Sequence, residues 1–161
     1  MEFNVDKCKV MHVGNTNNNS SYYMEGSQLT EVSYEKDLGV WISADMKCSK
    51  QCMYAFNKAT RVLGIIKRTI RFKYTKVMLS LYKTLLKPHV EYCSSAWNPH
   101  YIKDMQLIEK VQSRFTKMIK NMDGKTYEER LHWLRLWSFE ERRNRQDLIE
   151  VFTRVVQAIR G

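Results

Sequence analysis

The spacing of apolar residues changes near residue 46, and this change limits the folds that the chain can adopt. Before it, apolar and polar residues alternate in short runs such as 7–14 and 38–43, which is typical of β-strands. After it, apolar residues recur every three or four positions, as on amphipathic helices. The sequence therefore predicts an α+β fold. We expect a small antiparallel β-sheet or hairpin in residues 1–45 and a mainly α-helical bundle in residues 46–161.

Local signals place the expected elements more closely. Tyr22 to Thr30 is typical of a tight hairpin around Glu25, Gly26 and Ser27, and Ser49 is a suitable N-cap for the first helix. Pro88 should kink or split the second helix. The expected helices cover about 49–70, 75–97 and 101–122, followed by two helices that begin at the capping boxes Thr126-x-x-Glu129 and Ser138-x-x-Glu141.

Basic residues are concentrated in the middle of the chain. Residues 46–122 contain 16 Lys and Arg against 3 Asp and Glu, whereas residues 1–45 contain 3 against 7 and residues 123–161 contain 8 against 7. Such a local excess favours a polyanionic partner, most commonly nucleic acid, although a solvated helix face is the ordinary explanation of a charge run. On the third expected helix, four basic residues fall within roughly 60° of one another. The predicted nucleic-acid-binding residues are Lys58, Arg61, Lys67, Arg68, Lys103, Lys110, Arg114 and Lys117.

No metal site is expected in this chain. The four cysteines, at positions 8, 48, 52 and 93, fit neither a disulfide framework nor a zinc knuckle. Cys48 and Cys52 lie one helical turn apart and could supply half of a site with His89 or His132, but a free cysteine is more often a small buried hydrophobe. The chain has no apolar run of 18 residues and no signal-peptide pattern at its start. We therefore expect an intracellular protein without a membrane partner, in the nucleus or the cytoplasm.

Several stretches, taken together and in order, carry a resemblance to a known family. They are residues 1–14, Glu35-Lys36-Asp37-Leu38-Gly39-Val40, Lys87-Pro88-His89-Val90-Glu91-Tyr92-Cys93, Trp97-x-Pro99, Val111-Gln112-x-Arg114-x-Thr116-Lys117, Tyr127-Glu128-Glu129-Arg130-Leu131 and Arg142-Arg143-x-Arg145-x-Asp147-Leu148-Ile149. The chain resembles the C-terminal part of the reverse transcriptase, an RNA-directed DNA polymerase, of LINE-type non-LTR retrotransposons of the jockey-like group.

The resemblance implies a role for each segment. Residues 1–45 would be a remnant of the palm, in which Asn4 and Lys7 match a late motif whose lysine lies near the phosphates of the incoming nucleotide. Leu38, Gly39 and Val40 would form the primer grip, which holds the 3′ end of the primer. Residues 46–161 would be the helical thumb, which closes on the template–primer duplex. The expected partner is thus an RNA–DNA or DNA duplex, bound through its backbone without sequence preference.

The chain departs from the family at the catalytic centre. Polymerase chemistry uses Mg²⁺ ions held by aspartates, and the family has an adjacent Asp-Asp pair upstream of the matching region. None of the six aspartates here is next to another. We therefore expect a truncated polymerase fragment that begins within the palm and stops early, binds no cofactor and is inactive by itself, with Lys7 as a remnant. The alternative is a helical protein-interaction module that binds a protein partner through Trp97, Trp133 and Trp137.

Overall fold

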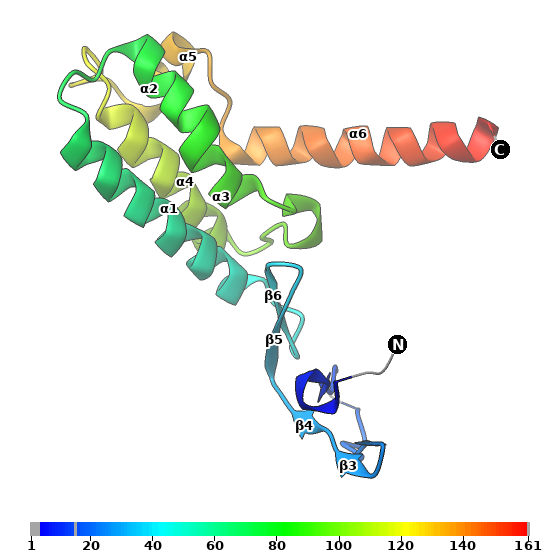
Figure 1. Ribbon diagram of the computed structural model, residues 1–161. Coiled ribbons are helices and arrows are strands. Elements are labelled where there is room, and N and C mark those ends of the chain that lie inside the picture. The colour runs from blue at the N-terminus through cyan, green and yellow to red at the C-terminus, as the bar shows by residue number, and fades with distance from the viewer. Residues whose placement is uncertain (1–3, 15, 161) are drawn as a thin grey trace. The chain divides into compact units, whose positions relative to one another are not determined.

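The computed structural model describes residues 4–14 and 16–160. Met1, Glu2 and Phe3 at the start of the resemblance, Asn15, and the last residue, Gly161, lie outside the described residues. The chain divides into two compact units, Met1–Gln51 and Cys52–Gly161. The first contains short strands and the second is a helical bundle, which confirms the mixed α+β class (Figure 1).

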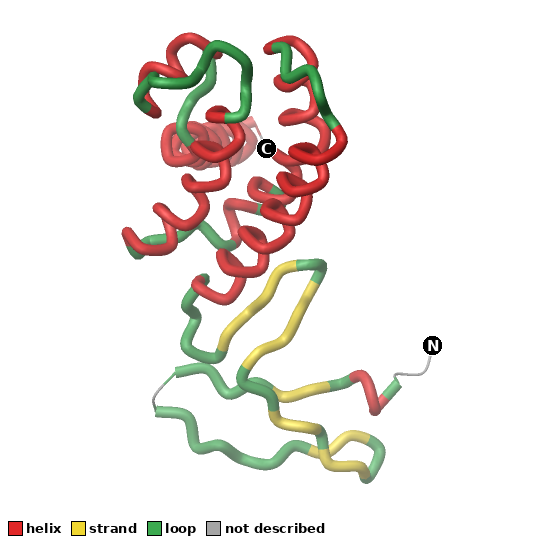
Figure 2. The backbone as a smooth tube through the Cα atoms, turned by 90° about the vertical axis from the view of Figure 1, so that its left-hand side faces the viewer, coloured by secondary structure: helices red, strands yellow, loops and turns green. Residues whose placement is uncertain are grey.

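Among its described residues, the first unit has three separate strand pairs instead of one antiparallel sheet (Figure 2). The 3-10 helix η1 (Val5–Lys7) precedes β1 (Lys9–Val10), so the strand expected from Lys7 begins later than predicted. β1 pairs with β4 (Thr30–Glu31) in parallel, and the prediction of an antiparallel sheet is wrong for this pair. β2 (Tyr23–Met24) and β3 (Ser27–Gln28) form the expected tight hairpin.

A second hairpin occupies the stretch that resembles the primer grip. β5 (Tyr34–Asp37) and β6 (Val40–Ser43) are antiparallel, with Asp37 opposite Val40. Leu38 and Gly39 form the two-residue turn, with φ angles of 44° and 88°. Positive φ at both turn positions is the type I′ arrangement, whose twist suits a hairpin. Leu38 was expected within a strand, but its left-handed backbone ends the strand before it.

The beginning of α1 (Ser49–Thr69) supports this second hairpin. The Lys50 ammonium lies 3.6 Å from the centre of the Tyr34 ring and 4.3 Å from that of Trp41. The Trp41 amide donates a hydrogen bond to Gln51 Oε1 at 3.0 Å. These contacts join both strands of the hairpin to residues that follow it in the chain.

The helical unit follows the predicted order, but the second helix is divided, and the third ends at Lys117 instead of about residue 122. The second helix consists of α2 (Thr75–Leu81), a π-helical segment η2 (Tyr82–Leu86) and α3 (Lys87–Glu91). Pro88 has no amide hydrogen and its ring would collide with the carbonyl four residues earlier, so the expected break is confirmed. The helix ends at Glu91 instead of Trp97, because Cys93 adopts a left-handed backbone with φ 53°. The short 3-10 helix η3 (Ser94–Ala96) follows.

Three further helices complete the unit. They are α4 (Ile102–Lys117), α5 (Tyr127–Leu134) and α6 (Phe139–Arg160). Both predicted capping boxes are confirmed: the Glu129 amide donates to Thr126 Oγ1 at 3.3 Å and the Glu141 amide donates to Ser138 Oγ at 3.2 Å. The paired glutamates accept in return from the Thr126 and Ser138 amides. These side chains satisfy backbone donors that a helix start otherwise leaves open.

The core of the bundle is built from the apolar faces of all these helices. Its fully buried side chains include Met78, Tyr82, Leu86, Val90, Ile108, Val111, Phe115, Ile119 and Phe139. Only the first turns of α6 take part in it, and Figure 1 shows the rest of α6 extending beyond the other helices of this unit. Among the described residues, no helix has the length and apolar character needed to cross a membrane.

Candidate nucleic-acid interface

A groove of about 430 Å³ lies between α1 and the end of α4. Its floor is apolar, formed by Leu63, Gly64 and Met118. Cationic side chains from both helices border it: Lys67 from α1, and Arg114 and Lys117 from α4. The groove therefore brings together three of the predicted nucleic-acid-binding residues, from two helices that are far apart in sequence.

The same groove contains a polar group without a protein partner. Thr60 lines it, and the buried Thr60 hydroxyl has no hydrogen-bond partner among the described residues. A buried hydroxyl normally has a partner, since leaving it unpaired costs about 1–3 kcal/mol. The Arg114 guanidinium also lies 5.6 Å from the centre of the Phe56 ring on α1. This contact fixes an α4 cation beside α1.

A second groove, of about 420 Å³, adjoins the first and shares Lys117 and Met118 with it. It is lined by the loop between α1 and α2 and by the residues that follow α4. The Lys120 amide donates a hydrogen bond to the Lys73 carbonyl at 3.0 Å, which joins these two segments. The lining residues of the second groove are Arg71, Phe72, Lys73, Tyr74, Lys117, Met118, Ile119, Lys120 and Asp123.

Two aromatic rings stand at the surface of the second groove. Phe72 and Tyr74 are stacked, with ring centres 6.1 Å apart and planes at 12°, and they are 70% and 52% exposed. The Lys120 ammonium lies 5.4 Å from the centre of the Tyr74 ring. Exposed rings among cations form the combination on which nucleic-acid bases stack.

Taken together, the two grooves are lined by six cationic side chains and one carboxylate, that of Asp123. Low-dielectric walls of one charge sign focus the electrostatic potential and attract counter-charged ligands. We name this surface the basic double groove. Its cations are Lys67, Arg71, Lys73, Arg114, Lys117 and Lys120.

The other predicted basic residues are exposed but do not line either of these grooves. Lys58 lies 4.8 Å from the centre of the Tyr54 ring, and Lys103 lies 5.7 Å from that of Tyr101. The remaining three are Arg61 and Arg68 on α1 and Lys110 on α4. Whether they contact nucleic acid stays a prediction.

Sequence reasoning missed Arg71, Lys73 and Lys120. A signal for two of them was present, because the loop reads Arg71-Phe72-Lys73-Tyr74 and alternates basic with aromatic residues. Such interleaving is typical of surfaces that bind single strands. Lys120 carries no comparable local signal, since its place beside Lys73 depends on how the segment after α4 packs against the loop between α1 and α2.

The residues assigned by resemblance in the first unit lie as follows. Lys7 is exposed at the end of η1, and its amide donates to the Asn4 carbonyl at 3.0 Å. Leu38 at the tip of the second hairpin is 84% exposed, whereas Val40 is buried. The tip therefore presents an apolar side chain to solvent.

The three tryptophans do not form the common exposed surface expected for a protein-interaction module. Trp97 is only 3% exposed, and its Nε1 donates to the Tyr92 carbonyl at 2.7 Å. Trp133 and Trp137 are exposed. Among the described residues of either unit, taken by itself, no three His, Cys, Asp or Glu side chains lie close enough together to hold one metal ion.

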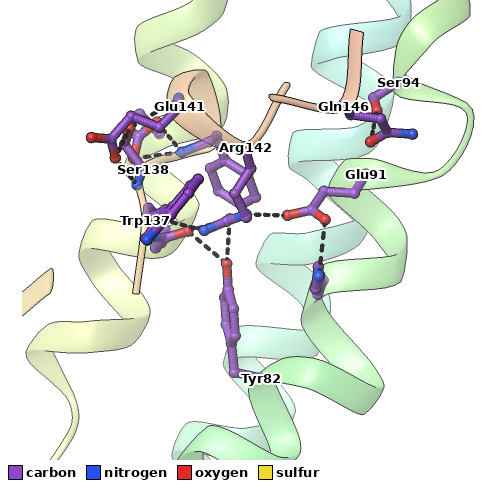
Figure 3. Close-up of polar contacts among 12 residues, drawn as sticks. Tyr82, Glu91, Ser94, Trp137, Ser138, Glu141, Arg142 and Gln146 are labelled. Atoms are coloured by element: carbon purple, nitrogen blue, oxygen red, sulfur yellow. Dashed lines mark hydrogen bonds and ion pairs between the residues drawn. The ribbon is translucent and has the colours of Figure 1, made fainter. Parts of the chain in front are cut away.

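A polar network fastens the start of α6 to the bundle (Figure 3). The Arg142 guanidinium donates to Glu91 Oε1 at 2.6 Å, to the Tyr82 hydroxyl at 2.8 Å and to Gln112 Oε1 at 2.6 Å. Arg142 and Gln112 also donate to the Trp137 carbonyl. Burial raises the pKa of Tyr82, so its hydroxyl stays neutral and can donate to Gln112. The network borders a pocket of about 350 Å³.

A second carboxylate orders the same region. Glu109 on α4 accepts hydrogen bonds from the Phe139 amide, at 3.1 Å to Oε2, and from the Tyr127 hydroxyl. Burial and this hydrogen bond to Glu109 raise the pKa of Tyr127. A negative charge at the first amide of α6 also suits the positive end of the helix dipole. These groups hold α4, α5 and the start of α6 together.

Comparisons with models of protein families, with curated protein sequences and with solved structures each found no match.

Proposed function

We propose that the helical unit binds the sugar–phosphate backbone of a nucleic-acid duplex along the basic double groove, as the thumb of a LINE-type reverse transcriptase would. The bound strand follows α1 and the end of α4. Binding is independent of base sequence, because cations read phosphates and not base edges. In this proposal the first unit corresponds to the end of the palm and the primer grip.

The observation that carries this proposal is the continuity of the two grooves. Lys117 and Met118 belong to both, so Lys67 and Arg114 on one side connect with Arg71, Lys73 and Lys120 on the other without an intervening acid in the shared wall. A backbone needs such a row of cations, since its phosphates follow one another at regular spacing. The exposed Phe72 and Tyr74 rings provide a place where an unpaired base at a strand end can stack.

The decisive experiment compares two triple variants of the complete chain. The groove variant changes Lys67, Arg114 and Lys117 to Glu. The control variant changes three exposed cations outside the double groove, Lys83, Arg135 and Arg154, to Glu. The net charge falls by the same amount in both variants. A difference in their binding therefore reflects where the substituted cations lie and not the total charge of the protein.

Binding of both variants to labelled RNA–DNA hybrid and DNA duplex is measured across a salt series. Each phosphate contact contributes about −0.9 to the slope of log affinity against log salt. Loss of three contacts should therefore make the slope of the groove variant less steep by about 2.7. The control variant keeps the slope and loses affinity only modestly. Equal slopes for the two variants, or no binding by the folded wild-type protein at low salt, would overturn the proposal.

A further inference from the structure

The pocket beside the Arg142 network is strongly cationic. It has a volume of about 350 Å³ and lies where η2 and α3 meet the linker between α5 and α6 and the start of α6. Its size falls at the lower end of the range of about 300–1,000 Å³ that small-molecule sites occupy. Glu91 is the one acid among its described lining residues, against five cations. The cations are Lys83, Lys87, Arg135, Arg142 and Arg145.

The charge of Glu91 is already shared by two of these cations. Its Oε1 accepts a hydrogen bond from Arg142 at 2.6 Å, and its Oε2 lies 3.4 Å from the Lys87 ammonium. Within the described part of the chain, the other three cations of the pocket form no ion pair. A concave surface whose uncompensated charges have one sign attracts a ligand of the opposite sign. The pocket therefore suits an anion that carries several charges.

The protein itself holds the buried side of this pocket in place (Figure 3). The Arg142 guanidinium donates to the Tyr82 hydroxyl at 2.8 Å as well as to Glu91, and it also donates to the Trp137 carbonyl. Gln112 Nε2 donates to the same carbonyl at 2.9 Å. A ligand does not have to order these groups, and such preorganisation lowers the free-energy cost of binding.

Trp137 gives the pocket a flat apolar wall. It is 47% exposed, and the Arg145 guanidinium lies 4.9 Å from the centre of its ring. Leu136 and Ile149 extend the apolar part of the lining. A flat ring next to cations is the arrangement on which nucleic-acid bases stack.

We propose that this pocket, which we name the α6 pocket, binds a free nucleoside di- or triphosphate. The base stacks on Trp137, and the phosphates face Lys83 and Arg135. A bare polyphosphate would leave the apolar wall in water, and a nucleoside would leave the cations without counter-charge, so the lining favours a ligand that has both parts.

This site differs from those described above. None of the six cations of the basic double groove lines the α6 pocket, so the inference does not rest on the proposed duplex binding. The resemblance would place the incoming nucleotide of a polymerase near Lys7, which belongs to the first unit, whereas the α6 pocket belongs to the second.

Isothermal titration calorimetry of the complete chain tests the class of ligand, with ATP, adenosine and inorganic tripolyphosphate as probes in a buffer that contains EDTA. Tripolyphosphate carries at least as much negative charge as ATP, so a surface that only attracts charge would bind it as tightly. We expect ATP to bind at least about tenfold more tightly than tripolyphosphate, because its base also stacks, and adenosine to bind most weakly.

Two double variants with the same change in net charge locate the site. Lys83→Glu with Arg135→Glu alters the α6 pocket and should weaken ATP binding at least about tenfold. Lys67→Glu with Lys117→Glu alters the basic double groove and should leave the dissociation constant of ATP within about threefold of the wild type. Circular dichroism establishes that both variants keep their helices.

A pair of tryptophan variants tests the stacking wall. Trp137→Leu should remove the preference for ATP over tripolyphosphate and leave tripolyphosphate binding within about threefold. Trp133→Leu is the matched control and should keep the preference, since Trp133 is also exposed and lies 5.0 Å from the Lys125 ammonium but does not line the pocket. No binding of ATP at millimolar concentration, no preference for ATP over tripolyphosphate, equal losses in the two double variants, or equal effects of W137L and W133L would overturn the proposal.

Discussion

Arg142 on α6 donates a hydrogen bond from Nε to Glu91 Oε1 on α3 at 2.6 Å (Figure 3). Only 18% of the Arg142 side chain and 16% of the Glu91 side chain are exposed. The other guanidinium nitrogens donate to Tyr82, Gln112 and the Trp137 carbonyl. One guanidinium thus ties the start of α6 to α3, η2 and α4.

Glu91→Gln should destabilise the protein by about 2 kcal/mol, because it leaves the mostly buried Arg142 charge without its counter-charge. Urea unfolding followed by circular dichroism measures this free energy. Glu150→Gln is the matched control, since Glu150 pairs with Arg154 at a similar distance of 2.5 Å in an exposed position. It should cost less than about 0.5 kcal/mol. Equal costs for the two substitutions would contradict the role given to the Arg142–Glu91 pair.

Substitution of the adjacent Arg143 should have the opposite effect on the free energy of unfolding. Arg143 is 4% exposed, and its Nε and Nη2 have no hydrogen-bond partner among the described residues. Its guanidinium lies 5.3 Å from the Trp97 ring centre and 5.9 Å from that of Phe139, and burial lowers its pKa.

Replacing a poorly paired buried charge by an apolar side chain of similar volume is often neutral or stabilising. Arg143→Met should therefore leave the free energy of unfolding within about 1 kcal/mol of the wild type or raise it. Arg142→Met, the adjacent control, should lower it by about 2–3 kcal/mol. The same urea titration measures both. A larger loss for Arg143→Met than for Arg142→Met would contradict this expectation.

The contrast between Arg142 and Arg143 could not be predicted from the sequence, although other features of the fold could. The helices and the capping boxes at Thr126 and Ser138 follow from local spacing and side-chain chemistry, so they were predictable. The environments of Arg142 and Arg143 depend on how α6 packs against α3 and Trp97, which no local pattern encodes. The early end of α3 was missed for a similar reason, since a left-handed residue at Cys93 has no strong sequence signal.

The candidate nucleic-acid interface was likewise only partly predictable from the sequence. The basic faces of α1 and α4 follow from helical periodicity, so the sequence could predict Lys67, Arg114 and Lys117 separately. That these three share one groove depends on the packing of α4 against α1. The second groove forms where the segment after α4 meets the loop between α1 and α2, and the Lys120 amide donates to the Lys73 carbonyl there. A long-range bond of this kind cannot be inferred from residue types alone.

Asp45 should titrate well below an ordinary aspartate. The Ser43 hydroxyl and the Lys47 amide donate to its carboxylate, and Lys47 also forms an ion pair with it at 3.1 Å. These bonds, the one from Ser43 first, lower the pKa of Asp45 from 3.8 to about 2. Because the pKa is lower in the folded state, the contribution to stability is complete above pH 3.8 and is lost as the pH falls from 3.8 towards 2.

Carbon-detected NMR of the Asp45 carboxyl measures this directly. The wild-type protein should give a midpoint near 2, and Ser43→Ala should move the midpoint up towards 3.8, because it removes the donor that lowers the pKa most. An unchanged midpoint in the Ser43→Ala variant would show that the hydroxyl is not the cause.

The tip of the second hairpin combines strain with exposure. Leu38 has a φ of 44° and is 84% exposed, although asparagine is the favoured residue before glycine in a type I′ turn. A left-handed backbone costs a non-glycine residue roughly 1–2 kcal/mol. Leu38→Asn should therefore stabilise the hairpin and slow hydrogen exchange of the β5 and β6 amides by about threefold or more.

If the exposed leucine contacts a primer strand, as the resemblance implies for a primer grip, the same substitution should weaken binding to a primer–template duplex while it strengthens the fold. Glu25→Asn is the matched control, because Glu25 and Gly26 form the equivalent turn of the first hairpin, with φ angles of 52° and 78°. It should slow exchange in β2 and β3 without weakening duplex binding. If Leu38→Asn raises stability but weakens duplex binding, and Glu25→Asn does not weaken binding, Leu38 contacts the primer and is not an ordinary turn residue. If neither substitution changes binding, Leu38 has no part in holding a primer.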